Sequence, residues 1–163
     1  MRKYILIAIG ALIILGIVRI ALDLHAEGSI SDTTKIQYVV RQAKEAAERK
    51  DADTISSTIS ADFNYEGFKA PQFRLLIRRC LGQIFNVQVE VPTPEVQLSG
   101  DTADVNCKTV KVRYSPDKGP MQTYTFNNFI LKMKKEPVKR YFIFNGYEWR
   151  ITSINEFPTN FGE

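Results

Sequence analysis

The chain opens with a continuous run of apolar and small residues. Residues 4–22 are interrupted by one charge, Arg19, and are preceded by a basic pair. As a helix, at about 1.5 Å per residue, the run would extend roughly 28 Å, close to the thickness of a bilayer's hydrocarbon core. Arg19 lies near the far end, where a long side chain reaches the headgroups. The basic pair predicts a cytoplasmic N-terminus with the following domain on the other side. The residues that define this signal anchor are Arg2, Lys3, Tyr4, Arg19 and Leu22.

A cleaved signal peptide is the alternative for this segment. Residues 24–26 match the small-x-small cleavage pattern poorly, and the apolar run is longer than a typical signal-peptide core, so we favour the anchor. Both interpretations export the domain, either tethered on the periplasmic or extracytoplasmic side or secreted after cleavage. We expect a cytoplasmic stub at 1–3, the anchor at 4–22, a linker at 23–32, a folded domain at 33–157 and a tail at 158–163.

Helical periodicity dominates the first part of the folded domain. Residues 33–50 place apolar side chains on one face, behind a cap at Ser31 or Asp32. A shorter helix follows Asp51, and a third begins at Ala70 with proline in its first turn. Between the last two, alternation at 63–66 predicts a short strand and a turn.

Alternation with a period of two begins at Phe85 and predicts strands to the end of the domain. The inward phase shifts near Lys108 and again near Asn128, which predicts matched bends in neighbouring strands. Residues 134–140 are predicted to form a basic loop, and 141–154 to supply strands around Asn145 and Gly146. The expected fold is therefore α+β, with three N-terminal helices packed in a strongly curved, cone-shaped antiparallel sheet, preceded by one transmembrane helix.

Three stretches resemble the nuclear transport factor 2-like superfamily, also called SnoaL-like or cystatin-like. They are the helix end at 46–53, the turn at 60–63 and the closing strand at 148–154, and the resemblance covers about residues 33–156. It suggests a membrane-anchored bacterial-type member with a pocket between helices and sheet. The superfamily includes isomerases, dehydratases, transport adaptors and secretion-system subunits, so the resemblance implies a shape rather than a reaction.

Residue content narrows the chemistry. The single histidine, His25, lies in the linker, which argues against histidine-dependent nucleophiles and histidine zinc sites. Cys80 and Cys107 lack metal-site spacing, and we expect them to be free thiols, although export would permit a disulfide. We expect no metal site, no cofactor and no catalytic residue.

The candidate pocket combines aromatic and aliphatic positions with a few polar ones. We interpret Asp62 as a turn residue, the tyrosines as packing residues and Trp149 as the plug of the core. The candidate lining residues are Tyr38, Asp62, Phe63, Phe73, Ile77, Tyr114, Phe126 and Trp149.

Basic residues gather in the C-terminal third. With 22 basic and 18 acidic residues in 163, the whole chain is too evenly balanced to indicate nucleic-acid binding. The gathered residues predict contact with anionic lipid or an acidic partner, and the alternative is a solvated face. This basic patch comprises Lys132, Lys134, Lys135, Lys139 and Arg140.

These patterns support two functional hypotheses. The favoured one is a membrane-tethered, non-catalytic binding or assembly module of the cell envelope. Its partners would be the bilayer, through the N-terminal helix, and another protein or a second copy of the chain. The alternative is a small isomerase- or dehydratase-like enzyme, or a carrier, that takes an apolar ligand in the cone.

Overall fold

The computed structural model describes residues 30–116, 119–140 and 144–157. The chain divides into a unit over Met1–Thr34 and a larger unit over Lys35–Glu163, and the larger unit contains the sheets and the core. The predicted anchor at 4–22 and the tail at 158–163 lie outside the described residues. In the part that is described, no helix has the length and apolar character needed to cross a bilayer.

Three helices form where the periodicity predicts them, and the first two begin at polar caps. They are α2 (Asp32–Glu48), α3 (Ala52–Ser57) and α4 (Ala70–Gln83). The Ser31 hydroxyl accepts the Thr34 N–H at 3.2 Å, and the Asp51 carboxylate accepts the Thr54 N–H at 2.9 Å. A two-stranded hairpin, β1 (Asn64–Tyr65) and β2 (Phe68–Lys69), joins α3 to α4.

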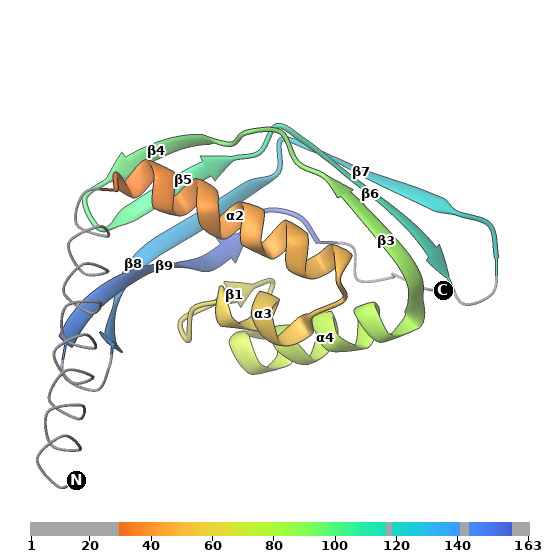
Figure 1. Ribbon diagram of the computed structural model, residues 1–163, viewed down its shortest axis with the longest axis horizontal. Helices are drawn as coiled ribbons and strands as arrows, with labels where there is room; N and C mark the ends of the chain where they lie inside the picture. The colour runs from red at the N-terminus through yellow and green to blue at the C-terminus, as the bar shows by residue number, and fades with distance from the viewer. Residues whose placement is uncertain (1–29, 117–118, 141–143, 158–163) are drawn as a thin grey trace, which may run out of the picture. The chain divides into compact units, whose positions relative to one another are not determined.

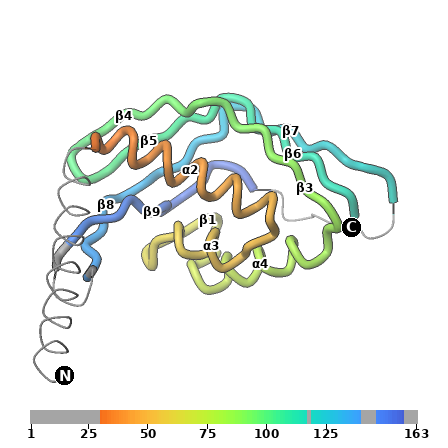
Figure 2. The backbone as a smooth tube through the Cα atoms, in the orientation of Figure 1, coloured from red at the N-terminus to blue at the C-terminus, as the bar shows by residue number. Residues whose placement is uncertain are grey.

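Seven further strands form two antiparallel sheets that arch over the helices (Figures 1 and 2). One sheet has the order β3-β6-β7 and the other β4-β5-β8-β9. The strands are β3 (Ile84–Glu90), β4 (Glu95–Ser99), β5 (Thr102–Asn106), β6 (Thr109–Pro116), β7 (Gln122–Asn127), β8 (Ile130–Arg140) and β9 (Phe144–Ile154). The predicted α+β class with three helices and curved antiparallel pairing is confirmed, but these strands form two sheets rather than the single sheet predicted.

The two sheets meet at a corner where neighbouring strands break together. Lys108, between β5 and β6, and Asn128, between β7 and β8, have left-handed φ angles of 51° and 57°. Across the corner the Cys107 N–H donates to the Phe129 carbonyl at 2.8 Å, and the Phe129 N–H donates to the Lys108 carbonyl at 3.1 Å. The two predicted shifts of phase are therefore confirmed as one paired bend, and its concave side faces the helices (Figure 1).

The core fills the space between α2, the end of α3 and the concave side of the sheets. Phe63 is fully buried and its ring stacks on Phe73 with centroids 4.4 Å apart. A parallel bridge between Ile59 and Ile151 ties the end of α3 to β9. Trp149, 3% exposed, packs within the same cluster, as its interpretation as a core plug requires.

The basic loop predicted at 134–140 is wrong, because β8 continues to Arg140 and pairs with β9 throughout. Proline inside a strand normally argues for a loop, since it cannot donate to the ladder. Beyond Lys135, whose N–H donates to the Asp101 carbonyl, β9 is the only described strand that pairs with β8. Pro137 therefore lies where an edge tolerates it. Asn145 and Gly146 likewise lie inside β9 rather than at a turn.

Phe85 is the second departure from the predicted pattern. Its side chain is 77% exposed, whereas Ile84, directly before it, and Val87, two residues after it, are buried. A register shift between Ile84 and Asn86 places an extra residue opposite β6 and turns Phe85 outward. The inward alternation of β3 thus starts at Val87.

Candidate functional site

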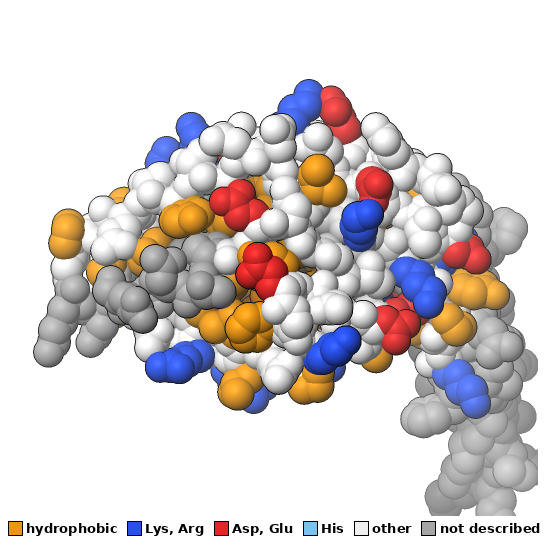
Figure 3. All heavy atoms as spheres, turned by 180° about the vertical axis from the view of Figure 1, so that it is seen from behind, with side chains coloured by type: hydrophobic (Ala, Val, Ile, Leu, Met, Phe, Trp, Pro, Cys, Tyr) orange, Lys and Arg blue, Asp and Glu red, His pale blue; other side chains and the backbone are white. Residues whose placement is uncertain are grey.

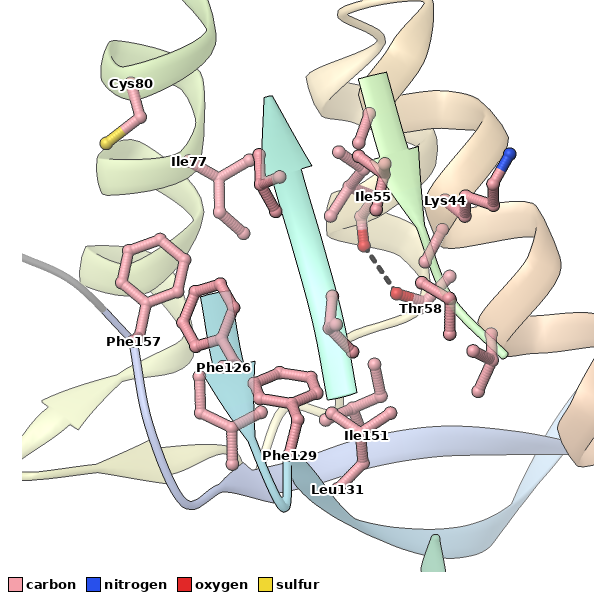
Figure 4. A pocket seen from close by; sticks show the side chains of 18 of the residues that line it. Lys44, Ile55, Thr58, Ile77, Cys80, Phe126, Phe129, Leu131, Ile151 and Phe157 are labelled. Carbon is pink, nitrogen blue, oxygen red and sulfur yellow. Dashed lines mark hydrogen bonds between the residues drawn. The ribbon is translucent and has the colours of Figure 1, made fainter. Parts of the chain in front are cut away.

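A cavity of about 260 Å³ lies beneath the corner, between the helices and the concave side of the strands (Figure 4). α2 contributes Ala43 and Ala47, whose methyl groups leave space that larger side chains would fill. The corner contributes Cys107 and Phe129, and Phe157 contributes from beyond β9. The paired bend and the small residues of α2 therefore both help to create the hollow.

The wall of the cavity is apolar almost throughout, and its polar atoms are already bonded. The Thr58 hydroxyl donates to the Ile55 carbonyl at 2.7 Å, and the Tyr114 hydroxyl donates to the Gln122 side chain at 2.6 Å. Lys44 lines the cavity, but its ammonium points away from it (Figure 4) and donates to Glu48 at 3.0 Å. Among the described lining residues there is no carboxylate and no imidazole. The wall can exclude water and hold an apolar body.

Two free thiols, Cys80 on α4 and Cys107 at the corner, line the same cavity. Burial raises the pKa of Cys80, and it raises the pKa of Cys107 to about 11. A thiol reacts as its thiolate, so both groups are poor nucleophiles near neutral pH. In this cavity they serve as small apolar wall elements.

We expect Cys107 to react slowly with thiol reagents until the pH is strongly alkaline. Relative to an ordinary thiol, a pKa of about 11 lowers the thiolate fraction at pH 8 by about a hundredfold. The measurement is the labelling rate of the Cys80→Ser chain against pH, with the same chain in urea as control. A rate that levels off near pH 9 in the folded chain would contradict the burial of Cys107.

The structure brings five of the eight candidate residues to the cavity and places three elsewhere. Phe63, Phe73, Ile77, Tyr114 and Phe126 line it. Sequence reasoning did not propose the other described lining residues, among them Ala43, Ala47, Cys80, Cys107, Phe129 and Phe157. The inward phase of the two cysteines was a usable signal, whereas a small residue such as alanine marks a hollow only once its surroundings are known.

Tyr38, Asp62 and Trp149 were expected to line the cavity, and the structure places all three outside its wall. Tyr38 is 54% exposed on the face of α2 away from buried Ile36 and Val40, because residues two apart on a helix point in different directions. Asp62 is exposed in the turn after α3, where its carboxylate lies 3.5 Å from the Lys134 ammonium. Trp149 is buried in the core but does not form part of the cavity wall.

The residues proposed as one basic patch are divided between two faces of β8. Lys132 and Lys134 are exposed two residues apart on one face. Lys135 belongs to the opposite face, where its ammonium lies 5.5 Å from the centre of the Tyr147 ring. Lys139 is exposed on the face of Lys135, and Arg140 is the last paired residue of β8. A single surface that contains all five is therefore not formed.

Comparison with known proteins identifies the fold. No family model matches the chain, and a search of curated proteins finds no relative. Among solved structures, a conserved protein from Planctomyces limnophilus matches 76% of this chain and 92% of its own, with a TM-score of 0.62 and 14% identity.

Two further solved structures carry assignments. A ketosteroid isomerase-like protein from Erwinia carotovora atroseptica matches 76% of this chain and 93% of its own, with a TM-score of 0.55 and 14% identity. A Streptomyces avermitilis protein assigned as a dehydratase of the NTF2-like family matches 76% and 92%, with a TM-score of 0.55 and 18% identity. Identities this low show the fold alone. On that evidence, the described part of the chain has the architecture of the nuclear transport factor 2-like proteins.

Proposed function

We propose that the domain binds a small apolar molecule in the cavity beneath the corner and holds it without transforming it. The observation that carries this proposal is the chemistry of the wall. Apolar side chains from α2, α4 and both sheets surround one cavity. The Thr58 and Tyr114 hydroxyls that reach the cavity are hydrogen-bonded to neighbouring residues. Burial of apolar surface is then the main source of affinity, at about 25 cal/mol per Å² removed from water.

The volume limits the size of the ligand. An apolar cavity of about 150 Å³ is large enough to stay dry and bind benzene. By proportion, a cavity of about 260 Å³ suits a ligand of about ten non-hydrogen atoms, such as a bicyclic aromatic or a short aliphatic chain. Naphthalene is therefore a suitable probe of the cavity.

An isomerase or dehydratase function is the alternative, since structural neighbours carry those assignments. Enolisation in a dry site requires a carboxylate base and a hydrogen-bond donor that converge on one carbonyl oxygen. The acidic candidate, Asp62, is exposed in a turn and faces Lys134. The described wall of the cavity supplies no carboxylate. These observations favour retention of a ligand over its turnover.

We further propose that residues 4–22 tether the domain to a membrane on the extracytoplasmic side. This part of the proposal is supported by the apolar run, which is interrupted by Arg19 alone, and by its basic N-terminal flank. The intact mass of the mature chain distinguishes a retained anchor from a cleaved leader.

We expect naphthalene at ten times its Kd to stabilise the full-length chain by about 1.4 kcal/mol, which corresponds to a Tm increase of roughly 3–6 °C. Ala47→Leu places an isobutyl group in the cavity and should abolish the increase. Ala61→Leu is the matched control, because it makes the same change at an exposed turn residue. Differential scanning calorimetry at a fixed detergent concentration measures both.

Two results would contradict the proposal. One is no ligand-induced increase in the unmodified chain. The other is an equal increase in Ala47→Leu and Ala61→Leu, which would place naphthalene outside the cavity. Conversion of a bound carbonyl compound, lost in Asp62→Asn, would favour the enzyme.

A further inference from the structure

The outer face of α4 exposes large apolar side chains beside arginines. Leu75 is 67% exposed and lies on the opposite side of the helix from buried Phe73 and Ile77. Phe85, one residue past the start of β3, is 77% exposed. Arg78 and Arg79 come between Leu75 and Phe85 in the sequence and are also exposed. We call Leu75, Arg78, Arg79 and Phe85 the α4 outer face.

The charges on this face remain available to a ligand in solution. Arg78 lies 2.6 Å from Asp53, but both side chains are largely exposed, at 67% and 84%, so the pair is screened and readily exchanged. Figure 3, which shows the molecule from behind, has blue and orange side chains alternating along the lower edge, the edge that α4 occupies in Figure 1. The face therefore offers cations and apolar groups together.

The same helix forms a wall of the cavity. Ile77, Cys80 and Leu81 line the hollow from the inner side of α4, and Ile84 lines it directly before Phe85. An α-helix with its side chains is about 10–12 Å across. One helix thus separates the α4 outer face from the space that we assign to the ligand.

We propose that the α4 outer face docks on an anionic lipid bilayer, with Phe85 and Leu75 inserted among the acyl chains and Arg78 and Arg79 against lipid phosphates. Interfacial helices bind membranes through this combination of large apolar and cationic side chains, and each cation near an anionic surface adds to the attraction. This inference rests on the proposed function. A bilayer concentrates small apolar molecules, and docking brings the cavity wall against that reservoir.

The charge and the apolar content of this face match an anionic bilayer. Leu75, Arg78 and Arg79 are all exposed and are spaced three and four residues apart on α4, so two cations lie beside an apolar side chain on one side of the helix. Arginine at a membrane surface extends its head to the phosphates while its stem stays apolar.

The test places a tryptophan at the docking position of the full-length chain. Phe85→Trp is compared with Tyr147→Trp, a control position on β9 that is 60% exposed. Both are bound to vesicles of phosphatidylcholine and phosphatidylglycerol in which a fraction of the acyl chains is brominated. Buried Trp149 gives the same background in both variants. Residues 4–22 would hold either variant on the vesicle, so quenching reports the position of the indole and not binding of the chain.

We expect bromolipid quenching to be several-fold stronger for Phe85→Trp than for Tyr147→Trp. Arg78→Gln and Arg79→Gln, each added to Phe85→Trp, should each lower the ratio of docked to undocked domain by about fivefold, from about 1 kcal/mol per cation. In pure phosphatidylcholine both contributions are lost, so quenching of Phe85→Trp should fall further than in either arginine variant.

Equal quenching of the two variants would overturn the docking proposal, and so would quenching of Phe85→Trp that does not depend on anionic lipid. The calorimetric experiment with naphthalene contains no vesicles, so its failure can be distinguished from a failure of membrane docking. If naphthalene stabilises the chain but the two tryptophan variants are quenched equally, the docking proposal is wrong and the proposed ligand-binding function stands. If quenching depends on anionic lipid but naphthalene has no effect on stability, the docking proposal is supported and the ligand-binding proposal is contradicted.

Discussion

Phe63→Ala should lower the free energy of unfolding by about 4 kcal/mol, the largest effect expected from a single truncation in this domain. The Phe63 ring is fully buried and stacks on Phe73 at 4.4 Å. It also lines the ligand cavity, so its removal enlarges an existing hollow that the neighbouring side chains already fail to fill. The loss therefore combines the lost transfer free energy of the ring with a cavity contribution that relaxation cannot recover.

Urea unfolding of the full-length chain, followed by far-ultraviolet circular dichroism, measures the change through the transition midpoint. Phe85→Ala is the matched control, since it removes the same ring at a position that is 77% exposed, and it should change the stability by no more than about 0.5 kcal/mol. Phe63→Leu keeps much of the volume and should give an intermediate loss. A loss below about 1.5 kcal/mol for Phe63→Ala would mean that the Phe63–Phe73 stack is not the centre of the core.

Some features of the fold could be predicted from the sequence, and others, such as the exposure of Phe85, could not. Helix starts could be predicted from the sequence because capping is local. Asp51 caps α3 through a hydrogen bond to a residue three positions away. The corner was readable because a bend changes which side chains face inward, and the phase changes at Lys108 and Asn128 coincide with it. The exposure of Phe85 was not readable, since a bulge that depends on pairing with β6 decides it.

The candidate site was less predictable than the fold. Tyr38 and Asp62 are candidates by their chemistry, but the face of α2 and the turn after α3 direct both side chains outward. Ala43 and Ala47 carry no chemical signal, yet they border the hollow. A cavity depends on which side chains are small at the place where several elements converge, and that place is defined only by the tertiary arrangement.

Phe129→Ala should change the size of ligand that the domain prefers. Phe129 lies at the corner, lines the cavity and has its ring 5.3 Å from that of Phe126. The two hydrogen bonds that Phe129 makes across the corner use its backbone, so truncation of the side chain leaves them in place. The expected result is a wider cavity in a domain about 2 kcal/mol less stable, because the lost ring is only partly buried.

We expect naphthalene to bind Phe129→Ala about tenfold more weakly, and phenanthrene, with one more ring, to bind it about tenfold more tightly than it binds the unmodified chain. Each tenfold step is about 1.4 kcal/mol, which corresponds to roughly 55 Å² of apolar surface lost or gained. Competition titrations monitored by phenanthrene fluorescence measure both affinities.

Tyr38→Ala is the control for that exchange of preference, since it also truncates an aromatic ring on a residue that was a candidate for the site. Tyr38 is exposed, with the Arg41 guanidinium 5.3 Å from its ring centre, so its truncation should leave both affinities unchanged. A change of preference in Tyr38→Ala without one in Phe129→Ala would place the ligand on the outer side of α2. The hollow beneath the corner would then be a packing defect, and ligand binding would have to be explained by a different surface of the domain.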